Sequence, residues 1–198
     1  MKFFIVYIAA FFLFSCHHSQ ESIEKDVKGI AKEIMTNAKN CALVTIDSLG
    51  VTHVRVMDPF LPDENFTVWM ATNPKSLKIR QIQNNETATL FYFDQKTGSY
   101  VTLQGIARIV NSQAKKDVFW KKEWKDFYKN RTTDYTLIRF RPNNAKIISE
   151  KYQLLGDPIT WEPSSIEFYK TKNNNFLIAK TLNEKLACLL FLIINLIV

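Results

Sequence analysis

Cysteine, glycine and proline are all scarce in this chain of 198 residues, which has three, five and six of them respectively. Three cysteines are too few for a disulfide-rich scaffold, and so little glycine and proline excludes collagen-like and low-complexity sequences. The sequence also lacks a His/Cys cluster with zinc-ligand spacing, a glycine-rich phosphate loop and a nucleophile elbow. With 46% hydrophobic residues, the chain instead suits one globular domain with a substantial core.

More than half of the net positive charge lies outside the central part of the chain. Lys and Arg outnumber Asp and Glu by 26 to 19, and the pI is 9.3, which by itself would favour a nucleic-acid partner. From Cys16 to Phe168, however, there are 21 basic and 18 acidic residues. Residues 115–131 alone hold seven of these basic residues against three acidic ones, which is typical of a solvated face. We therefore expect no nucleic-acid partner.

The first fifteen residues predict export. Lys2 precedes an apolar run from Phe3 to Phe14, and Ser15 stands directly before Cys16. The run is too short to span about 30 Å of hydrocarbon, so it fits a signal peptide better than a membrane span.

The order Leu13-Phe14-Ser15-Cys16 resembles a bacterial lipobox. In that interpretation residues 1–15 are removed, Cys16 is acylated, and residues 16–24 tether a protein held at the membrane surface of the bacterial cell envelope, on the periplasmic side. An ordinary signal, or an anchor helix with an incidental cysteine, is the alternative.

The C-terminal residues 169–198 form a polar linker and an apolar tail. Residues 170–180 are rich in Asn, and Leu186 to Val198 contains one polar residue, Asn195. A helix over this tail would be only about 20 Å long, which is short for a membrane span. The tail could pack on the domain, enter the membrane or be a non-native extension, and the sequence leaves these alternatives open. Cys41 and Cys188 show no sign of being a pair.

The central part alternates between short apolar strands and amphipathic helices. An N-terminal helix is expected from Ser22 to Asn40, since Ile23, Val27, Ile30 and Ile34 recur at helical spacing. Strands are expected at Cys41–Ile46, Val51–Met57, Phe66–Ala71, Thr87–Phe93, Tyr100–Val110, Tyr135–Phe140, Lys146–Ile148 and finally Ile159–Trp161. The fold class is therefore mainly β with inserted helices (α+β), in a closed or nearly closed antiparallel barrel.

Two further helices are expected between the strands. A short one opens at Pro74 and continues through Ile79 and Ile82. A long one is capped by Ser112 and carries an aromatic stripe that we interpret as core, with the lysines on its other face solvated. The stripe consists of Phe119, Trp120, Trp124, Phe127 and Tyr128, and the lysines are Lys115, Lys116, Lys121, Lys122, Lys125 and Lys129.

The most informative residues are cations placed among apolar ones. Arg55 lies inside an apolar strand, which is unfavourable unless an anion or a carboxylate meets it. Ser76 and Lys78 open the next helix, where a phosphate could bind, so the three residues could grip one phosphate together. Alternatively, Arg55 pairs with Asp58 or Glu64 and Lys78 is merely solvated. His53, which shares a strand face with Arg55, fits a structural or rim role better than a catalytic one.

Several of these motifs, taken in order, resemble a known family over roughly residues 25–168. They are Arg55-Val56-Met57-Asp58-Pro59, Trp69-Met70-Ala71-Thr72, Ser76-Leu77-Lys78, Leu90-Phe91-Tyr92, Tyr100 to Ala107, the region around Trp120, and Gly156 to Trp161. This order and spacing is similar to the FMN-binding split β-barrel of the pyridoxamine 5'-phosphate oxidase-like superfamily, especially its general-stress-protein branch. The barrel expected from this resemblance is antiparallel, with six to seven strands.

The resemblance implies a homodimer with two FMN sites at its interface. Arg55 and Lys78 would hold the FMN phosphate with Ser76, and the backbone of Val56 and Met57 would lie along the isoalloxazine ring. Ala71 and Thr72 would line the same site, whereas Tyr100 and Val101 would come from the partner subunit. A flat apolar ring and a dianionic phosphate need these kinds of groups.

The chain also departs from the family pattern. Leu77 stands where the oxidase has an arginine, which removes one cation, and the substrate-binding histidine and arginine of the oxidase have no match here. Vitamin B6 oxidation is therefore not expected. The resemblance implies a flavin-dependent oxidoreductase acting on an unknown small substrate, with no catalytic residue or metal ligand assigned. The alternative is a stress lipoprotein that binds flavin, haem or a deazaflavin without turnover.

Overall fold

The computed structural model describes residues 27–168. The predicted signal peptide, Cys16 and its tether, the start of the N-terminal helix and residues 169–198 with Cys188 lie outside the described residues. Within the described part, no helix is long and apolar enough to cross a membrane.

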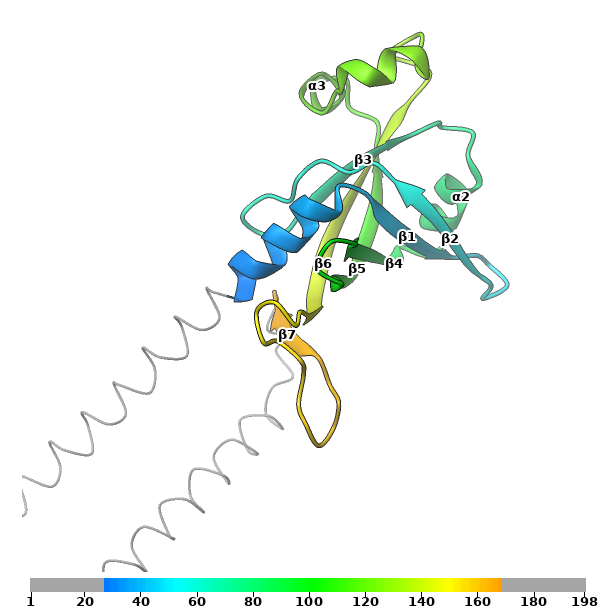
Figure 1. Cartoon of the computed structure of the whole chain (residues 1–198). Helices are drawn as coiled ribbons and strands as arrows, with labels where there is room; N and C mark the ends of the chain where they lie inside the picture. Colours follow the sequence, from blue (N-terminus) through cyan, green and yellow to red (C-terminus); the bar gives the residue numbers. More distant parts are fainter. Residues whose placement is uncertain (1–26, 169–198) are drawn as a thin grey trace, which may run out of the picture. The chain divides into compact units, whose positions relative to one another are not determined.

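The described part of the N-terminal helix covers residues 27–38 (Figure 1). Ile30, Ala31, Ile34 and Met35 are buried, as their helical spacing predicts. The helix ends before Lys39, whose φ of 61° lies in the left-handed region that commonly terminates helices.

Seven antiparallel strands form one sheet, which confirms the predicted fold class (Figure 1). The pairing order is β2-β1-β4-β5-β6-β3, and β7 pairs with β6. The strands are β1 (Cys41–Ile46), β2 (Thr52–Met57), β3 (Val68–Thr72), β4 (Thr87–Asp94), β5 (Ser99–Val110), β6 (Thr136–Ile148) and β7 (Ser164–Glu167).

The two ends of this order, β2 and β3, meet only briefly. An isolated bridge joins Pro59 to Met70, and the N–H of Phe60 donates to the carbonyl of Trp69 at 2.8 Å. In the regular sheet β2 pairs only with β1, and β3 only with β6. The barrel is therefore closed at this bridge and open beside it, as a split barrel requires.

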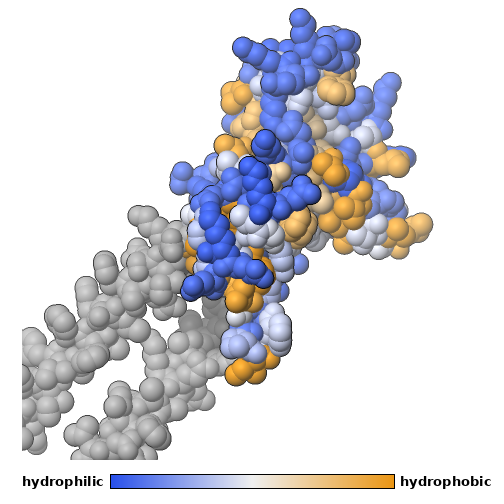
Figure 2. All heavy atoms as spheres, viewed as in Figure 1, coloured by the Kyte–Doolittle hydropathy of each residue, from blue (hydrophilic) through white to orange (hydrophobic). Residues whose placement is uncertain are grey.

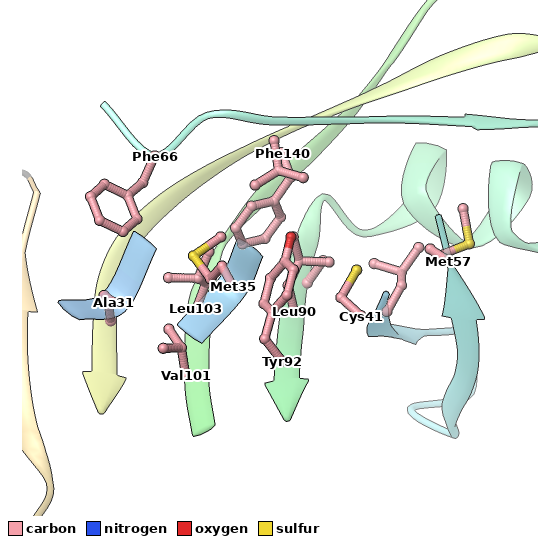
Figure 3. Packing of buried hydrophobic residues seen from close by; sticks show 14 of the residues in the cluster. Ala31, Met35, Cys41, Met57, Phe66, Leu90, Tyr92, Val101, Leu103 and Phe140 are labelled. Atoms are coloured by element: carbon pink, nitrogen blue, oxygen red, sulfur yellow. The ribbon is translucent and has the colours of Figure 1, made fainter. Parts of the chain in front are cut away.

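The inward side chains of the strands and the N-terminal helix form the core (Figure 3). Leu43, Leu90 and Leu103, on three adjacent strands, are fully buried, and Met35 packs against them from the helix. Cys41 belongs to this cluster, and burial raises the pKa of its thiol to about 12. This agrees with its interpretation as a small buried hydrophobe.

The prediction of one long helix after Ser112 is wrong. The chain forms a short helix α3 (Gln113–Val118) and a separate 3-10 helix η1 (Lys122–Asp126). Phe119 stacks on Trp69 with ring centroids 4.4 Å apart, while Trp124 packs edge-on against Tyr135. Phe119 caps the end of α3, whereas Trp124 lies in η1, so the two rings make these contacts from different elements. One straight helix could not make both contacts.

Two residues of this segment also differ from the prediction. Lys116 is buried rather than solvated, and its Nζ donates to the carbonyl of Thr132 at 2.7 Å while lying over the ring of Tyr135. Phe127 is 79% exposed instead of belonging to the core. Tertiary contacts therefore override helical periodicity in this segment.

The predicted end of the sheet changes in two places. Tyr135–Phe140 and Lys146–Ile148, which the sequence predicts as two strands, merge into one strand, β6. Within β6, Pro142 pairs with Gly105 at a shift in the pairing register. A bulge of this kind accommodates a proline, and a Cβ on Gly105 would lie 2.2 Å from the carbonyl of Arg141. Ile159–Trp161 is a turn rather than a strand, because the Asp157 carboxylate accepts the N–H groups of Ile159 and Thr160.

Candidate functional site at the split of the barrel

A pocket of about 380 Å³ opens where β2 and β3 separate. It is lined by Val56, Met57, Asp58, Ala71, Thr72, Lys78, Glu123, Trp124, Phe127 and Tyr128. The strand edges facing it have no strand partner among residues 27–168 beyond the Pro59–Met70 bridge. This split pocket therefore combines strand backbone and aromatic side chains with one cation, Lys78, and two carboxylates, Asp58 and Glu123.

Arg55 lies on β2 directly before Val56, which lines this pocket, and is held by four hydrogen bonds. Its Nη1 donates to Thr45 Oγ1 at 2.6 Å and to the carbonyls of His53 and Leu43 at 3.1 and 3.3 Å. Its Nη2 donates to Gln81 Oε1 at 2.8 Å, from the helix α2 (Leu77–Asn84). All four acceptors are neutral.

Lys78, Thr72 and Ser76 form a second polar group beside Arg55. Lys78 Nζ donates to Thr72 Oγ1 at 2.9 Å, and the hydroxyls of Thr72 and Ser76 are 3.3 Å apart. Ser76 occupies the N-cap position of α2, but its side chain makes no capping hydrogen bond. The first N–H groups of the helix are thus left beside two hydroxyls and a cation, which is an arrangement suited to an anion.

The two cations repel each other. Burial lowers the pKa of Lys78, and the nearby charge of Arg55 lowers it further. Burial also lowers the pKa of Arg55. Within the described residues, neither cation forms an ion pair with a carboxylate, so the pair carries uncompensated positive charge.

The alternative in which Arg55 pairs with Asp58 or Glu64 is wrong. Asp58 instead accepts hydrogen bonds from Lys121 Nζ and from Trp124 Nε1, and Glu64 forms an ion pair with Lys32 at 3.3 Å. Both carboxylates are therefore directed to other cations.

The segment η1 and the residues after it form the aromatic wall of the split pocket. Lys121 donates to Asp58 and also to the carbonyl of Pro59 at 2.8 Å, which fixes η1 against the end of β2. Trp124 is buried behind this contact, whereas Phe127 remains exposed at the pocket. Figure 1 shows this segment at the end of the barrel next to β3.

The structure brings six of the predicted site residues to one place. Val56, Met57, Ala71, Thr72 and Lys78 line the split pocket, and Ser76 contacts Thr72. Arg55 reaches the same α2 helix through Gln81.

Tyr100 and Val101, predicted to come from a partner, do not line this pocket. The side chain of Val101 is fully buried in the core. Tyr100 lies on the opposite face of β5, with its ring 5.6 Å from that of Phe91.

The sequence did not predict that Thr45 and Gln81 hold Arg55. It also did not predict the contact of Asp58 with the η1 segment. Thr45 lies at an inward position of β1 that alternation predicts to be buried, so a buried hydroxyl was the signal available there. Gln81 is likewise on the buried face of α2 with Ile82. Polar residues at such positions need a partner, although the sequence does not say which one.

His53 lies outside the arrangement around the split pocket. Its Nε2 is 2.8 Å from Asp47 Oδ2, and the other oxygen of that carboxylate accepts the N–H groups of Leu49 and Val51 at 2.9 Å. The histidine thus braces the hairpin turn. Among the described residues, no three His, Cys, Asp or Glu side chains are grouped as metal ligands.

A protein-family model described as "Pyridoxamine 5'-phosphate oxidase like" matches residues 25–155. No curated protein matches the chain.

Solved structures share the fold. General Stress Protein 26 from Bacillus anthracis str. Sterne is 22% identical with a TM-score of 0.57, and the match covers 71% of this chain and 98% of that one. A protein related to general stress protein 26 from Clostridium acetobutylicum is 17% identical with a TM-score of 0.60, over 74% of this chain and 99% of that one. An FMN binding protein from Nostoc punctiforme PCC 73102, related to pyridoxamine 5'-phosphate oxidase, is 15% identical with a TM-score of 0.50, over 73% and 96%.

Proposed function

Because the chain belongs to the pyridoxamine 5'-phosphate oxidase-like family, we propose that it binds FMN at the split between β2 and β3. The observation that carries this proposal is the pair of cations Arg55 and Lys78, which stand beside the pocket without a carboxylate partner in the described residues. Uncompensated charge on half-buried cations such as these is stabilised by an anionic ligand.

The residues present fit the two ends of FMN. Arg55 and Lys78, with the hydroxyls of Thr72 and Ser76, would hold the phosphate through charge-assisted hydrogen bonds. The unpaired strand edges at Val56–Met57 and Ala71–Thr72 would face the ring system. A volume of about 380 Å³ lies within the range of pockets that bind small molecules.

We further propose that the protein is a flavin-dependent oxidoreductase acting on an unknown small substrate. Bound FMN supplies the hydride or electron transfer, so the protein needs only to bind, orient and shield its reactants. Leu77, in place of a cation, leaves the phosphate end with fewer charges than the oxidase pattern has. A role in stress and a non-catalytic flavin-binding function are both compatible with the same pocket.

The central experiment is flavin retention by the full chain. The wild type is expected to purify with FMN or to take it up from solution, whereas Arg55→Ala combined with Lys78→Ala raises the dissociation constant at least about a hundredfold, since each cation makes a charge-assisted contact. Lys96→Ala with Lys125→Ala is the matched control, because both lysines are exposed outside the pocket. Equal FMN binding by both double variants would refute the assigned site.

Reduction of the bound flavin separates an enzyme from a binding protein. We expect a reduced nicotinamide to bleach the flavin absorbance, and a substrate acceptor to restore it. A haem spectrum in the purified protein, or a deazaflavin extracted from it, would instead support the alternative ligands.

We propose that the protein is a homodimer with FMN at its interface. An apolar surface, here called the outer face, covers the side of the sheet opposite the core. Val56, Ala42 and Phe91 lie in one row across β2, β1 and β4, and Val54 and Val56 are 64% and 73% exposed. Figure 2 shows apolar side chains at the surface over β2. Since Val56 also lines the split pocket, a subunit docked on the outer face would reach the edge of the site.

We propose that Cys16 carries a lipid that anchors the protein to the bacterial cell envelope. The support is the order Leu13-Phe14-Ser15-Cys16 after an apolar run. Labelling with palmitate is expected in the wild type and absent in Cys16→Ser, and equal labelling of both would exclude the anchor. An exported flavoprotein must also acquire FMN, so purification from the native envelope with identification of its ligand is the decisive accompanying measurement.

A further inference from the structure

Three side chains from β1, β2 and α2 form a closed hydrogen-bonded ring, and the Arg55 in it directly precedes Val56 of the split pocket. Thr45 Oγ1 donates to Gln81 Oε1 at 2.8 Å. Arg55 donates from Nη1 to Thr45 Oγ1 at 2.6 Å and from Nη2 to Gln81 Oε1 at 2.8 Å. Thr45 is fully buried and Gln81 is 6% exposed, so two of the three members of the ring lie inside the protein, and the third, Arg55, is half-buried.

The ring occupies one particular edge of the guanidinium. A guanidinium has five N–H groups in a rigid planar fork, and two neighbouring N–H groups on one edge can bind two oxygens at once. The edge formed by Nη1 and Nη2 faces Thr45 and Gln81, and the carbonyls of His53 and Leu43 take up the remaining N–H of Nη1. Among the described residues, Nε–H and the second N–H of Nη2 have no acceptor. These two N–H groups form the other edge of the fork.

The ring also leaves the charge of Arg55 intact. Threonine and glutamine satisfy the hydrogen-bonding groups of the guanidinium without contributing a negative charge. A carboxylate at either position would hold Arg55 equally well but would neutralise it. Lys78, whose pKa is lowered by burial and by the charge of Arg55, is a second cation near the guanidinium.

We propose that Thr45 and Gln81 are positioning residues that present the Nε edge of Arg55 to the phosphate group of the ligand. The ring thereby sets the preference of the site for a phosphomonoester such as FMN over the same flavin without its phosphate. This inference rests on the proposed function, since it concerns the ligand of the same pocket.

Gln81→Glu is the sharpest test, because it preserves the size and the hydrogen-bond acceptor of the side chain while adding a negative charge next to Arg55. Gln83→Glu is the matched control: it makes the same change two residues away on α2, at an exposed position. Dissociation constants for FMN and for riboflavin are measured on the full chain by flavin fluorescence quenching.

The expected result is a change in selectivity. Gln81→Glu raises the dissociation constant for FMN about tenfold or more, which corresponds to the loss of one charge-assisted contact, and changes that for riboflavin less than about twofold. Gln83→Glu changes both less than about twofold. A merely structural role of Gln81 would weaken both ligands together, and that result would overturn the proposal, as would unchanged affinities.

Thr45 gives an independent check of the ring. Thr45→Val removes the hydroxyl and is expected to lower the preference for FMN, and Thr45→Ser is expected to restore it. Thermal unfolding shows whether Gln81→Glu is folded. If it is not, Gln81→Met removes the hydrogen-bond acceptor without adding a charge, and the same loss of preference for FMN is expected. Retention of the full preference by Thr45→Val and Gln81→Met would overturn the proposal.

Inorganic phosphate separates this inference from the proposed function. Phosphate is expected to raise the unfolding temperature of the wild type and of Gln83→Glu, but not that of Gln81→Glu. If the wild type binds no FMN yet shows this pattern with phosphate, the flavin proposal fails and the ring stands. If phosphate stabilises Gln81→Glu as well as the wild type, the ring has no role in anion binding.

Discussion

The indole Nε1–H of Trp124 donates to Asp58 Oδ2 at 3.0 Å, although the two residues are 66 positions apart in the chain. The other oxygen of the same carboxylate accepts from Lys121. Asp58 directly follows β2, and Trp124 lies in η1, so this contact fixes the aromatic wall of the split pocket to one of the strands that form it. The shape of the pocket therefore depends on a contact that is not itself part of the anion site.

Trp124 and Phe127 are expected to contribute differently to stability and to FMN binding at the aromatic wall. Trp124→Phe removes the indole N–H and part of a buried ring, and is expected to lower the free energy of unfolding by about 1 to 2 kcal/mol in urea titrations. Phe127→Ala, at a residue that is 79% exposed, is expected to change it by less than about 0.5 kcal/mol. FMN affinity should nevertheless fall in Phe127→Ala, since Phe127 lines the pocket. The opposite order of stabilities would contradict this account.

The outer face predicts a dimer that charge can disrupt. Val54→Lys combined with Phe91→Lys places two cations in the proposed interface, where unpaired charge is strongly unfavourable. We expect light scattering after gel filtration to show the mass of a dimer for the wild type and that of a monomer for this variant.

Leu49→Lys with Val118→Lys is the control for the dimer experiment. Both residues are exposed, at 86% and 69%, and neither belongs to the outer face, so the dimer should persist with the same added charge. A wild type that is monomeric at all concentrations would exclude the interface.

The sequence is sufficient to predict most of the strands because their burial alternates. β1 alternates between buried and half-buried residues, and β4 and β5 largely do the same, which is the period-two pattern of a sheet with one face in a core. The segment from α3 to η1 could not be predicted, since its aromatic residues occur at helical spacing but contact Trp69, Phe60 and Tyr135 on other elements. Contacts between distant elements are not encoded in local periodicity.

The candidate site shows the same limit. Arg55 and Lys78 stand out in the sequence because a cation in an apolar strand, or next to a helix start, demands an explanation. Thr45 and Gln81 do not stand out, since a neutral polar residue is common in strands and helices. Their role follows only from the approach of α2 to β1 and β2, where Gln81 meets both other members of the ring.

Cys41 is expected to be inert in the folded protein. Burial raises the pKa of its thiol to about 12, and the thiolate is the reactive form. Wild type and Cys41→Ser should therefore bind the same number of equivalents of a thiol reagent under native conditions. After unfolding, the wild type should bind one equivalent more, and faster native labelling of the wild type would contradict the burial of this side chain.

The pH dependence of FMN affinity should report both the phosphate and Lys78. Affinity is expected to rise between about pH 5 and 7, because the second phosphate pKa is about 6 and the dianion binds the two cations more strongly. It should fall again in the alkaline range, below the ordinary lysine value of 10.5, since burial and Arg55 lower the pKa of Lys78.

The stability of the apoprotein should move in the opposite direction over the same alkaline window. There the unfolded chain binds more protons than the folded protein at Lys78, so the free energy of unfolding rises with pH. Lys78→Arg keeps its proton at high pH and should lose the alkaline decline in affinity, while any titration of the flavin ring is common to both proteins. An alkaline decline of the same size in Lys78→Arg, measured by fluorescence titration at each pH, would show that Lys78 does not hold the phosphate.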